Sequence, residues 1–171
     1  MTHSDFSEEW FLESFGPEVP SRTQLGPKWD KRFLEMAKLV STWSKDPSTQ
    51  TGAVIVGPDR TILGVGYNGF PREMEDTPER YANREEKYSR IIHCEMNALL
   101  SVRRPVPDGS ILYTYPFLSC DRCVVHMIQT GIYEFVAPVC PPDKAARWEE
   151  VFKRSRSYIQ ECGGYYVEVE L

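Results

Sequence analysis

Four side chains suited to metal chemistry stand in two short segments of the sequence. His93 and Glu95 lie in "RIIHCEMNALL" (residues 90–100), and Cys120 and Cys123 lie in "YPFLSCDRCVVHMI" (residues 115–128). Imidazole nitrogen and thiolate sulfur are common zinc ligands in proteins, and three such ligands leave one of four tetrahedral positions open. An open position is typical of catalytic rather than structural zinc. The pattern therefore predicts a catalytic Zn2+ site with His93, Cys120 and Cys123 as ligands.

Glu95 is predicted to move protons rather than to bind the metal. Zinc lowers the pKa of bound water toward neutrality, so a nearby carboxylate that is not a ligand can take the proton. His93 and Glu95 are two residues apart and would point to different sides in mid-helix, so they can share a site only where the chain enters a helix. Cys120 and Cys123 share a face at a helix start, where the dipole favours thiolates. The site therefore needs two helix starts that face each other.

The remaining cysteines and histidines are interpreted as structural. Cys94 is expected to be a small buried helix residue. His126 is the alternative fourth ligand, but its position deeper along the helix counts against it. Cys140 and Cys162, at a strand end and in a helix face, are expected to have structural roles. The competing interpretation of the whole cluster is a structural zinc site or a coincidence.

Hydrophobic periodicity and turn residues predict the elements that hold this site. We expect helices over residues 29–43, 82–102, 121–130 and 143–162, and strands over 51–56, 61–67, 110–115, 133–139 and 165–171. The first two strands flank "GPDR", a hairpin signal, and the later strands alternate with helices. This order predicts a three-layer α/β/α sandwich with a mixed five-stranded sheet. Ligands of such sheets bind at strand ends, where helices begin.

Composition limits the class of protein. The 171 residues suit one domain, residues 28–171, preceded by an acidic N-terminal extension of residues 1–27. No apolar run approaches the roughly 20 residues of a membrane span, and the N-terminus lacks a secretory signal, which predicts a cytoplasmic protein. Without an export signal, five cysteines favour a metal or redox site over disulfides. The net charge of −5 argues against a polynucleotide partner.

The sequence resembles the cytidine and deoxycytidylate deaminase family, whose signature is His-x-Glu followed by Pro-Cys-x-x-Cys. Four segments carry the resemblance in the expected order: "WSKDPSTQTGAVIV", "GVGYNGFP", "HCEMNALL" and "CDRC". The match runs from about Trp29 to Gly131 and is nearest to the deoxycytidylate branch, to which "GYNGFP" points. The resemblance implies that residues 28–171 are a zinc-dependent deaminase domain with the cytidine deaminase-like fold. It also implies the hydrolytic deamination of dCMP to dUMP.

The same resemblance implies roles for individual residues. Glu95 would remove a proton from zinc-bound water, pass it to ring N3 and later protonate the departing amine. Asn68 would hydrogen-bond the sugar. The full set of substrate-binding residues would be Asn68, Tyr67, Phe70, Pro71, Ala53 and Tyr115.

Partners and regulation follow from the resemblance as well. Relatives form homo-oligomers, with a hexamer favoured, and many are activated by dCTP and inhibited by dTTP together with Mg2+. The implied partner is a small deoxynucleotide rather than a membrane. Among the cations that could bind its phosphate, the candidates are Arg72, Lys87 and Arg90, with Arg84 and Lys45 as further cases. The sequence leaves the choice among them open.

Two positions depart from the family pattern. Cys94 stands where the family usually has alanine, and Ser119 stands where it usually has proline. Serine is a good helix N-cap, so Ser119 is predicted to start the helix that holds the thiols. The loop "TYPFLS" then differs from the family at one wall of the base pocket, which bears on substrate choice more than on the metal site.

Other functions remain open on the sequence alone. The substrate could instead be another cytosine nucleotide or nucleoside, guanine, or a modified pyrimidine nucleotide. A regulatory nucleotide-binding protein with a structural zinc is the main non-enzyme alternative, and Glu95 argues against it because a structural site does not need that carboxylate. An editor of tRNA or single-stranded DNA conflicts with the acidic balance of the chain.

Overall fold

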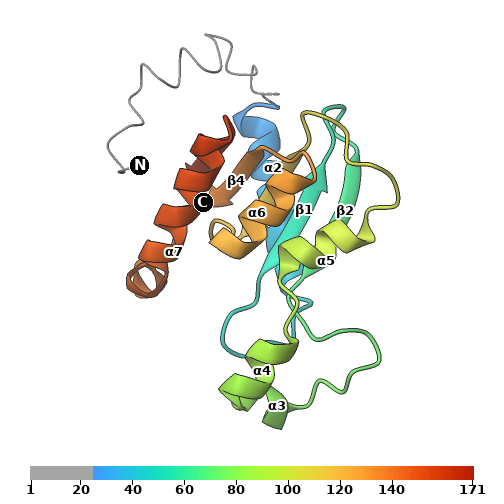
Figure 1. Ribbon diagram of the computed structural model, residues 1–171, viewed down its shortest axis with the longest axis vertical. Coiled ribbons are helices and arrows are strands. Elements are labelled where there is room, and N and C mark those ends of the chain that lie inside the picture. The colour runs from blue at the N-terminus through green and yellow to red at the C-terminus, as the bar shows by residue number, and fades with distance from the viewer. Residues whose placement is uncertain (1–24) are drawn as a thin grey trace, which may run out of the picture.

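The computed structural model describes residues 25–171, which form a five-stranded mixed sheet covered by helices on both faces (Figure 1). The strands are β1 (Gly52–Val56), β2 (Ile62–Tyr67), β3 (Ile111–Tyr115), β4 (Glu134–Pro138) and β5 (Tyr165–Val169). The helices are α2 (Pro27–Ser41), α3 (Pro78–Ala82), α4 (Arg84–Arg90), α5 (Cys94–Ser101), α6 (Asp121–Gln129) and α7 (Pro142–Glu161). The predicted N-terminal extension lies, up to residue 24, outside the described part.

The strand order is β2-β1-β3-β4-β5, with β1 antiparallel to both β2 and β3, and with β3, β4 and β5 parallel. Alternate residues of a strand face opposite sides of a sheet. Ala53 and Ile55 accordingly pack with residues of α5, α6 and α7, whereas Val54 and Val56 pack with residues of α2. The predicted three-layer α/β/α sandwich with its mixed five-stranded sheet is confirmed.

One predicted helix is wrong in an informative way. Periodicity predicts a continuous helix from residue 82 to residue 102, but Asn83 separates α3 from α4, and the chain is extended from Ile91 to His93 before α5 begins. Asn83 accepts hydrogen bonds from the backbone N–H groups of Glu85 and Glu86, so it starts a new helix. Ile92 exchanges two backbone hydrogen bonds with Gly69 (2.8 and 3.1 Å), which satisfies the chain at the interruption.

Two smaller expectations are also corrected. The predicted first helix includes Trp43, yet Trp43 lies beyond the end of α2 and is 52% exposed. Cys162 is predicted in the face of the last helix, but it is the exposed C-cap residue of α7. Both lie where a helix ends, and helix ends are the least certain part of a periodicity argument.

Helix α5 lies directly against β2. A Cβ atom added to Gly66 would overlap the α5 backbone at Cys94, Asn97 and Ala98. Only glycine permits this approach, which fixes the start of α5 relative to the sheet. None of the helices in residues 25–171 has the length and apolar character that a membrane crossing requires.

Candidate metal centre and substrate pocket

The two helix starts required by the sequence argument are present. His93 is the N-cap residue of α5, and Cys120 is the N-cap residue of α6, with Cys123 in the first turn. Ser119 is predicted to be the N-cap of this helix, but the N-cap is the next residue, Cys120. Ser119 is buried before the helix begins, and its backbone oxygen accepts a hydrogen bond of 2.9 Å from the Ser155 hydroxyl.

The three predicted ligands come together at these starts. The ligand atoms of His93, Cys120 and Cys123 all lie within 4.8 Å of one another. The Nδ1 atom of His93 is 3.4 Å from Cys120 Sγ and 3.5 Å from Cys123 Sγ. A tetrahedral zinc with its usual bond lengths to nitrogen and sulfur would separate such atoms by about 3.6 Å. The spacing and the donor types therefore fit zinc.

Charge is distributed unevenly over this cluster. A hydrogen bond from Cys123 lowers the pKa of the Cys120 thiol to about 5, and the same contact raises the pKa of Cys123. The hydrogen bond with Cys120 raises the pKa of His93 to about 9. These contacts favour the thiolate form of Cys120, and metal binding releases the protons that the ligands still carry.

Glu95 lies beside the cluster without belonging to it. It is buried (5% exposed) in the first turn of α5, yet it reaches the same pocket as His93 and Cys120. Cys94 Sγ donates a hydrogen bond of 3.2 Å to Glu95 Oε2. Burial raises the pKa of Cys94, which keeps that thiol protonated and able to donate. Cys94 is buried as predicted and helps to orient Glu95.

The alternative ligand, His126, does not join the cluster. It is exposed on α6, and its Nδ1 lies 2.5 Å from the backbone oxygen of Arg122 on the same helix. It is three residues beyond Cys123, one turn further from the helix start. The only group of potential metal ligands found among the described residues consists of His93, Cys120 and Cys123.

A pocket opens over the metal centre. It lies between α7 on one side and, on the other, α4 and the segment that precedes β1. Its lining includes His93, Cys120 and Glu95. The pocket extends to Asp46, Asn68 and Lys87 on one side and to Arg147 and Trp148 on the other. Phe117 forms part of the wall, and its ring lies 5.6 Å from that of Trp148 and 5.4 Å from that of Phe152. An aromatic wall beside a metal centre suits a planar heterocyclic base.

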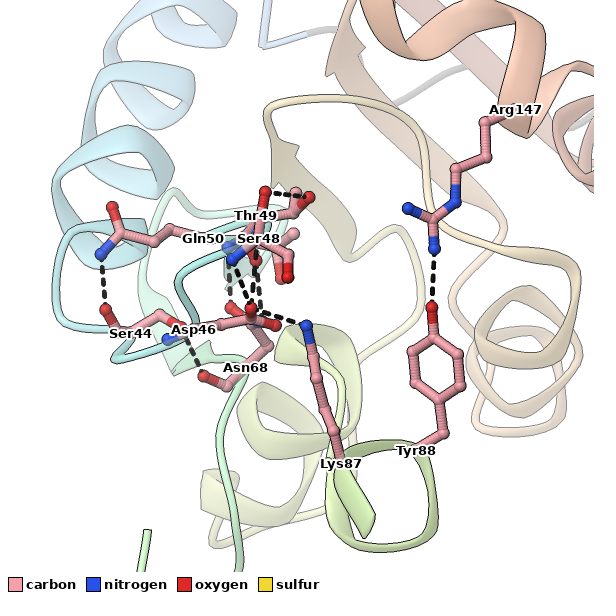
Figure 2. Close-up of polar contacts among 10 residues, drawn as sticks. Ser44, Asp46, Ser48, Thr49, Gln50, Asn68, Lys87, Tyr88 and Arg147 are labelled. Carbon is pink, nitrogen blue, oxygen red and sulfur yellow. Dashed lines mark hydrogen bonds and ion pairs between the residues drawn. The ribbon is translucent and has the colours of Figure 1, made fainter. Parts of the chain in front are cut away.

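A buried polar network forms the opposite side of the pocket (Figure 2). Lys87 Nζ lies 2.7 Å from Asp46 Oδ1, and both side chains are buried. Asn68 Nδ2 donates to Asp46 Oδ2 (3.1 Å) and to the backbone oxygen of Thr49 (3.0 Å), and Asn68 Oδ1 accepts from the Thr51 N–H (2.8 Å). This network holds residues 46–51 against Asn68, which follows β2, and against Lys87 on α4.

The predicted substrate-binding residues divide into two groups. Asn68 and Tyr115 line the pocket. Both amide hydrogens of Asn68 are engaged, so only one lone pair of Oδ1 is left for a sugar hydroxyl. Their contacts with a substrate stay predictions.

The other members of that set lie outside the pocket lining: Ala53, Tyr67, Phe70 and Pro71. Ala53 is fully buried within β1. The Tyr67 ring meets Trp43 edge-on at 6.1 Å, and the Phe70 ring stacks on Tyr81 at 4.5 Å. Their roles in substrate binding stay predictions.

The phosphate candidates also separate. Lys87 lines the pocket but is paired with Asp46. Arg90 pairs with Glu86 one turn earlier on α4 (2.7 Å), and Arg72 is exposed on the loop after β2; neither lines the pocket. Lys45 pairs with Asp76 at the surface (3.0 Å).

Sequence reasoning missed several residues of this pocket, above all Arg147. The periodicity that predicts its helix concerns only the apolar face and says nothing of the cations beside it. Arg147 is 59 positions from Tyr88, to which it donates a hydrogen bond of 2.6 Å. The one available signal was the adjacent pair Arg147–Trp148 at the start of α7, where an aromatic residue and a cation share one turn.

Comparisons with known proteins agree with this geometry. The family model described as the cytidine and deoxycytidylate deaminase zinc-binding region matches residues 27–138. An uncharacterized deaminase in the luxG 3' region of Aliivibrio fischeri is 40% identical over 136 residues, which cover 80% of this chain and 90% of that protein. The deoxycytidylate deaminase of Mus musculus is 34% identical over 114 residues, or 64% of each chain. The chain therefore spans slightly less than two thirds of that relative.

A solved structure has the same fold. The dCMP deaminase of the cyanophage S-TIM5, crystallised in complex with dCMP and dUMP, superimposes with a TM-score of 0.66 at 20% sequence identity. The superposition covers 85% of this chain and all of the phage chain.

Proposed function

The chain belongs to the cytidine and deoxycytidylate deaminase family, a family of zinc hydrolases, and we propose that it converts dCMP to dUMP and ammonia. The names of several relatives, including the murine and human proteins, support deoxycytidylate as the substrate. The phage enzyme with the same fold was crystallised with dCMP and dUMP.

The observation that carries the proposal is the position of Glu95. Three zinc-type ligands on two helix starts would suit either a structural or a catalytic site if they stood alone. A buried carboxylate that opens into the same pocket, held by a neighbouring thiol rather than by a cation, has no structural task in a zinc site. It has a clear task in hydrolysis, where protons must move between water, base and leaving group.

Zinc, when bound by His93, Cys120 and Cys123, supplies Lewis-acid activation of water and stabilises negative charge on oxygen. Glu95 accepts the first proton of the attacking water at a carboxylate oxygen and passes it to N3 of the cytosine ring. It then transfers the second proton of that water to the exocyclic amine, which leaves as ammonia. The aromatic wall around Phe117 and Trp148 holds the base and excludes further water.

The decisive experiment replaces Glu95 by an isosteric amide. Glu95→Gln should keep zinc at one equivalent and lower kcat for dCMP by about 10^2- to 10^4-fold, because the amide cannot carry the proton. Glu150→Gln, at an exposed position of α7, is the matched control and should retain the wild-type kcat. Ammonia release from dCMP, CMP, cytidine and dCTP, with zinc measured by mass spectrometry, gives the readout.

Two results would contradict this assignment. If Glu95→Gln loses its zinc, the carboxylate supports the metal rather than the reaction. If the wild-type protein leaves dCMP intact and deaminates another of these compounds, the substrate is wrong while the reaction class stands.

The same proposal extends to domain limits and assembly. We assign the activity to residues 28–171, with residues 1–27 as an extension. Homo-oligomer formation, with a hexamer as the expected state, and regulation by dCTP and by dTTP with Mg2+ belong to the proposal as well. Native mass spectrometry, and dCMP assays with each effector, test them directly.

A further inference from the structure

A second pocket adjoins the one over the metal centre. The two share four lining residues: Ser48, Lys87, Tyr88 and Arg147. The remaining lining of the second pocket consists of Tyr81, Ala82 and Arg84. A molecule that occupies the first pocket can therefore extend into the second without crossing another part of the protein.

The second pocket is strongly basic for so acidic a chain. Three of its seven lining residues are cations, Arg84, Lys87 and Arg147, and none is a carboxylate. The chain as a whole has a formal net charge of −5. A cationic recess in an anionic protein concentrates positive potential where an anion can enter.

These three cations are not equally available to a ligand. Lys87 is compensated by Asp46 at 2.7 Å. Arg84, which lies over the Tyr88 ring at 5.3 Å, lines only the second pocket, whereas Arg147 lines both. Arg147 donates to the neutral Tyr88 hydroxyl and lies over the Trp148 ring. Within residues 25–171 no ion pair connects Arg147 to a carboxylate. Its charge is therefore free to pair with an anion.

Arg147 on α7 and Tyr88 on α4 both place hydrogen-bond donors at the second pocket. Figure 2 shows Lys87 and Tyr88 leaving α4 in the same region, Lys87 toward Asp46 and Tyr88 toward Arg147 on α7. Because the Tyr88 oxygen accepts from Arg147, its own hydrogen is available to a ligand. The planar guanidinium has further N–H groups, arranged in the fork that matches phosphate oxygens.

We propose that Arg147, assisted by Tyr88, binds the 5'-phosphate of the substrate and thereby makes the pocket selective for nucleotides over nucleosides. This inference rests on the proposed function, because it places the base at the metal centre and the phosphate in the adjoining recess. It assigns the phosphate to a cation on α7 instead of Arg72, Lys87 or Arg90. Arg147 contacts the phosphate and not the reacting atoms, so it is a specificity residue.

The test is the ratio between a nucleotide and its nucleoside. Arg147→Ala should raise KM for dCMP by roughly 10- to 100-fold, the usual effect of losing a charge-assisted hydrogen bond to phosphate, with a smaller change in kcat. The factor by which Arg147→Ala lowers kcat/KM for deoxycytidine should be at least about tenfold smaller than the factor for dCMP. Arg147→Lys keeps the charge without the fork and should lie between Arg147→Ala and the wild type.

Two further variants separate binding from structure. Tyr88→Phe breaks the contact between α4 and α7 but keeps the Arg147 charge, so KM for dCMP should rise by only a fewfold, about 2- to 5-fold. Lys153→Ala removes an exposed cation elsewhere on α7 and should behave as the wild type. Isothermal titration of zinc-loaded protein with dUMP and with deoxyuridine gives the same comparison without turnover. Arg147→Ala should weaken only dUMP binding by tenfold or more.

The outcomes distinguish this inference from the function beneath it. If the wild type deaminates dCMP and Arg147→Ala leaves KM and dUMP affinity within about twofold, the phosphate binds elsewhere and the inference is overturned. It is overturned as well if Arg147→Ala lowers kcat/KM for dCMP and for deoxycytidine by the same factor, because Arg147 then acts on the fold of the pocket. If the wild type does not deaminate dCMP, the proposed function fails regardless of Arg147.

Discussion

The buried pair between Asp46 and Lys87 offers a quantitative test of what holds the pocket together. The Lys87 side chain is 10% exposed and the Asp46 side chain 4% exposed, and their atoms are 2.7 Å apart. Removing one partner of a buried pair leaves an uncompensated charge that costs about 3–5 kcal/mol. The cost of removing each partner should differ. Asp46 also accepts hydrogen bonds from the Ser48 N–H (2.8 Å) and from Asn68 Nδ2 (3.1 Å), so its charge keeps other partners when Lys87 is lost. The Lys87 ammonium has Asp46 as its one hydrogen-bond partner among residues 25–171.

Asp46→Asn should therefore lower the free energy of unfolding by about 3 kcal/mol, and Lys87→Met by the smaller amount of about 1–2 kcal/mol. The double variant leaves no buried charge unpaired, so its loss should fall short of the sum of the two single losses by about 2 kcal/mol. Urea denaturation of zinc-loaded protein, followed by circular dichroism, measures each value, provided that the m-value is unchanged.

The surface pair Lys45–Asp76 is a matched control for this cycle. Its atoms are 3.0 Å apart, but the side chains are 68% and 38% exposed, so Lys45→Met should cost less than about 0.5 kcal/mol. Additivity of the Asp46 and Lys87 losses within about 0.5 kcal/mol would refute the argument, because it would mean that the two charges do not depend on each other.

Two further predictions concern the frame of the site. Gly66→Ala should destabilise the protein by at least about 3 kcal/mol or prevent folding, because its Cβ would overlap the α5 backbone, whereas Gly69→Ala, whose Cβ would meet only Tyr67 ring carbons at 3.8 and 4.0 Å, should be nearly neutral in urea denaturation. Removal of zinc by a chelator should abolish deamination and lower the melting temperature, with both restored by added Zn2+. Full activity in protein shown by mass spectrometry to be metal-free would contradict the assignment of the centre.

The metal ligands were predictable because their geometry is local. Cys120 and Cys123 share a face whenever the helix begins at that point, and His93 and Glu95 can converge only at a helix start. Ligand geometry therefore requires a helix start near His93, whereas periodicity predicts a continuous helix over residues 82–102. The structure agrees with the ligand geometry, because the chain is interrupted before Cys94, where α5 begins. What the sequence did not reveal was how the backbone groups at that interruption are satisfied. The answer is the bridge from Ile92 to Gly69, formed with a residue 23 positions away.

The phosphate end was not predictable for a related reason. Arg72, Lys87 and Arg90 are near the signature in the sequence, but proximity in the sequence does not say whether a cation is already paired. Lys87 is paired with Asp46, 41 positions away, which only the folded chain shows. Arg90 is paired with Glu86, four residues earlier on α4. Arg147 becomes a candidate because α7 packs beside the pocket, a consequence of tertiary contacts that periodicity does not encode.

The packing of α7 also connects the two ends of the site. Arg154 Nε lies 2.7 Å from Asp121 Oδ2 in the first turn of α6, and the Ser155 hydroxyl donates to the backbone oxygen of Ser119 just before that helix. These contacts hold α7 against the helix start that carries Cys120 and Cys123. Arg147 lies about two turns before Arg154 on the same helix. Because the same helix carries Arg147, the distance from the metal centre to the proposed phosphate contact would be set by α7 rather than by a flexible loop.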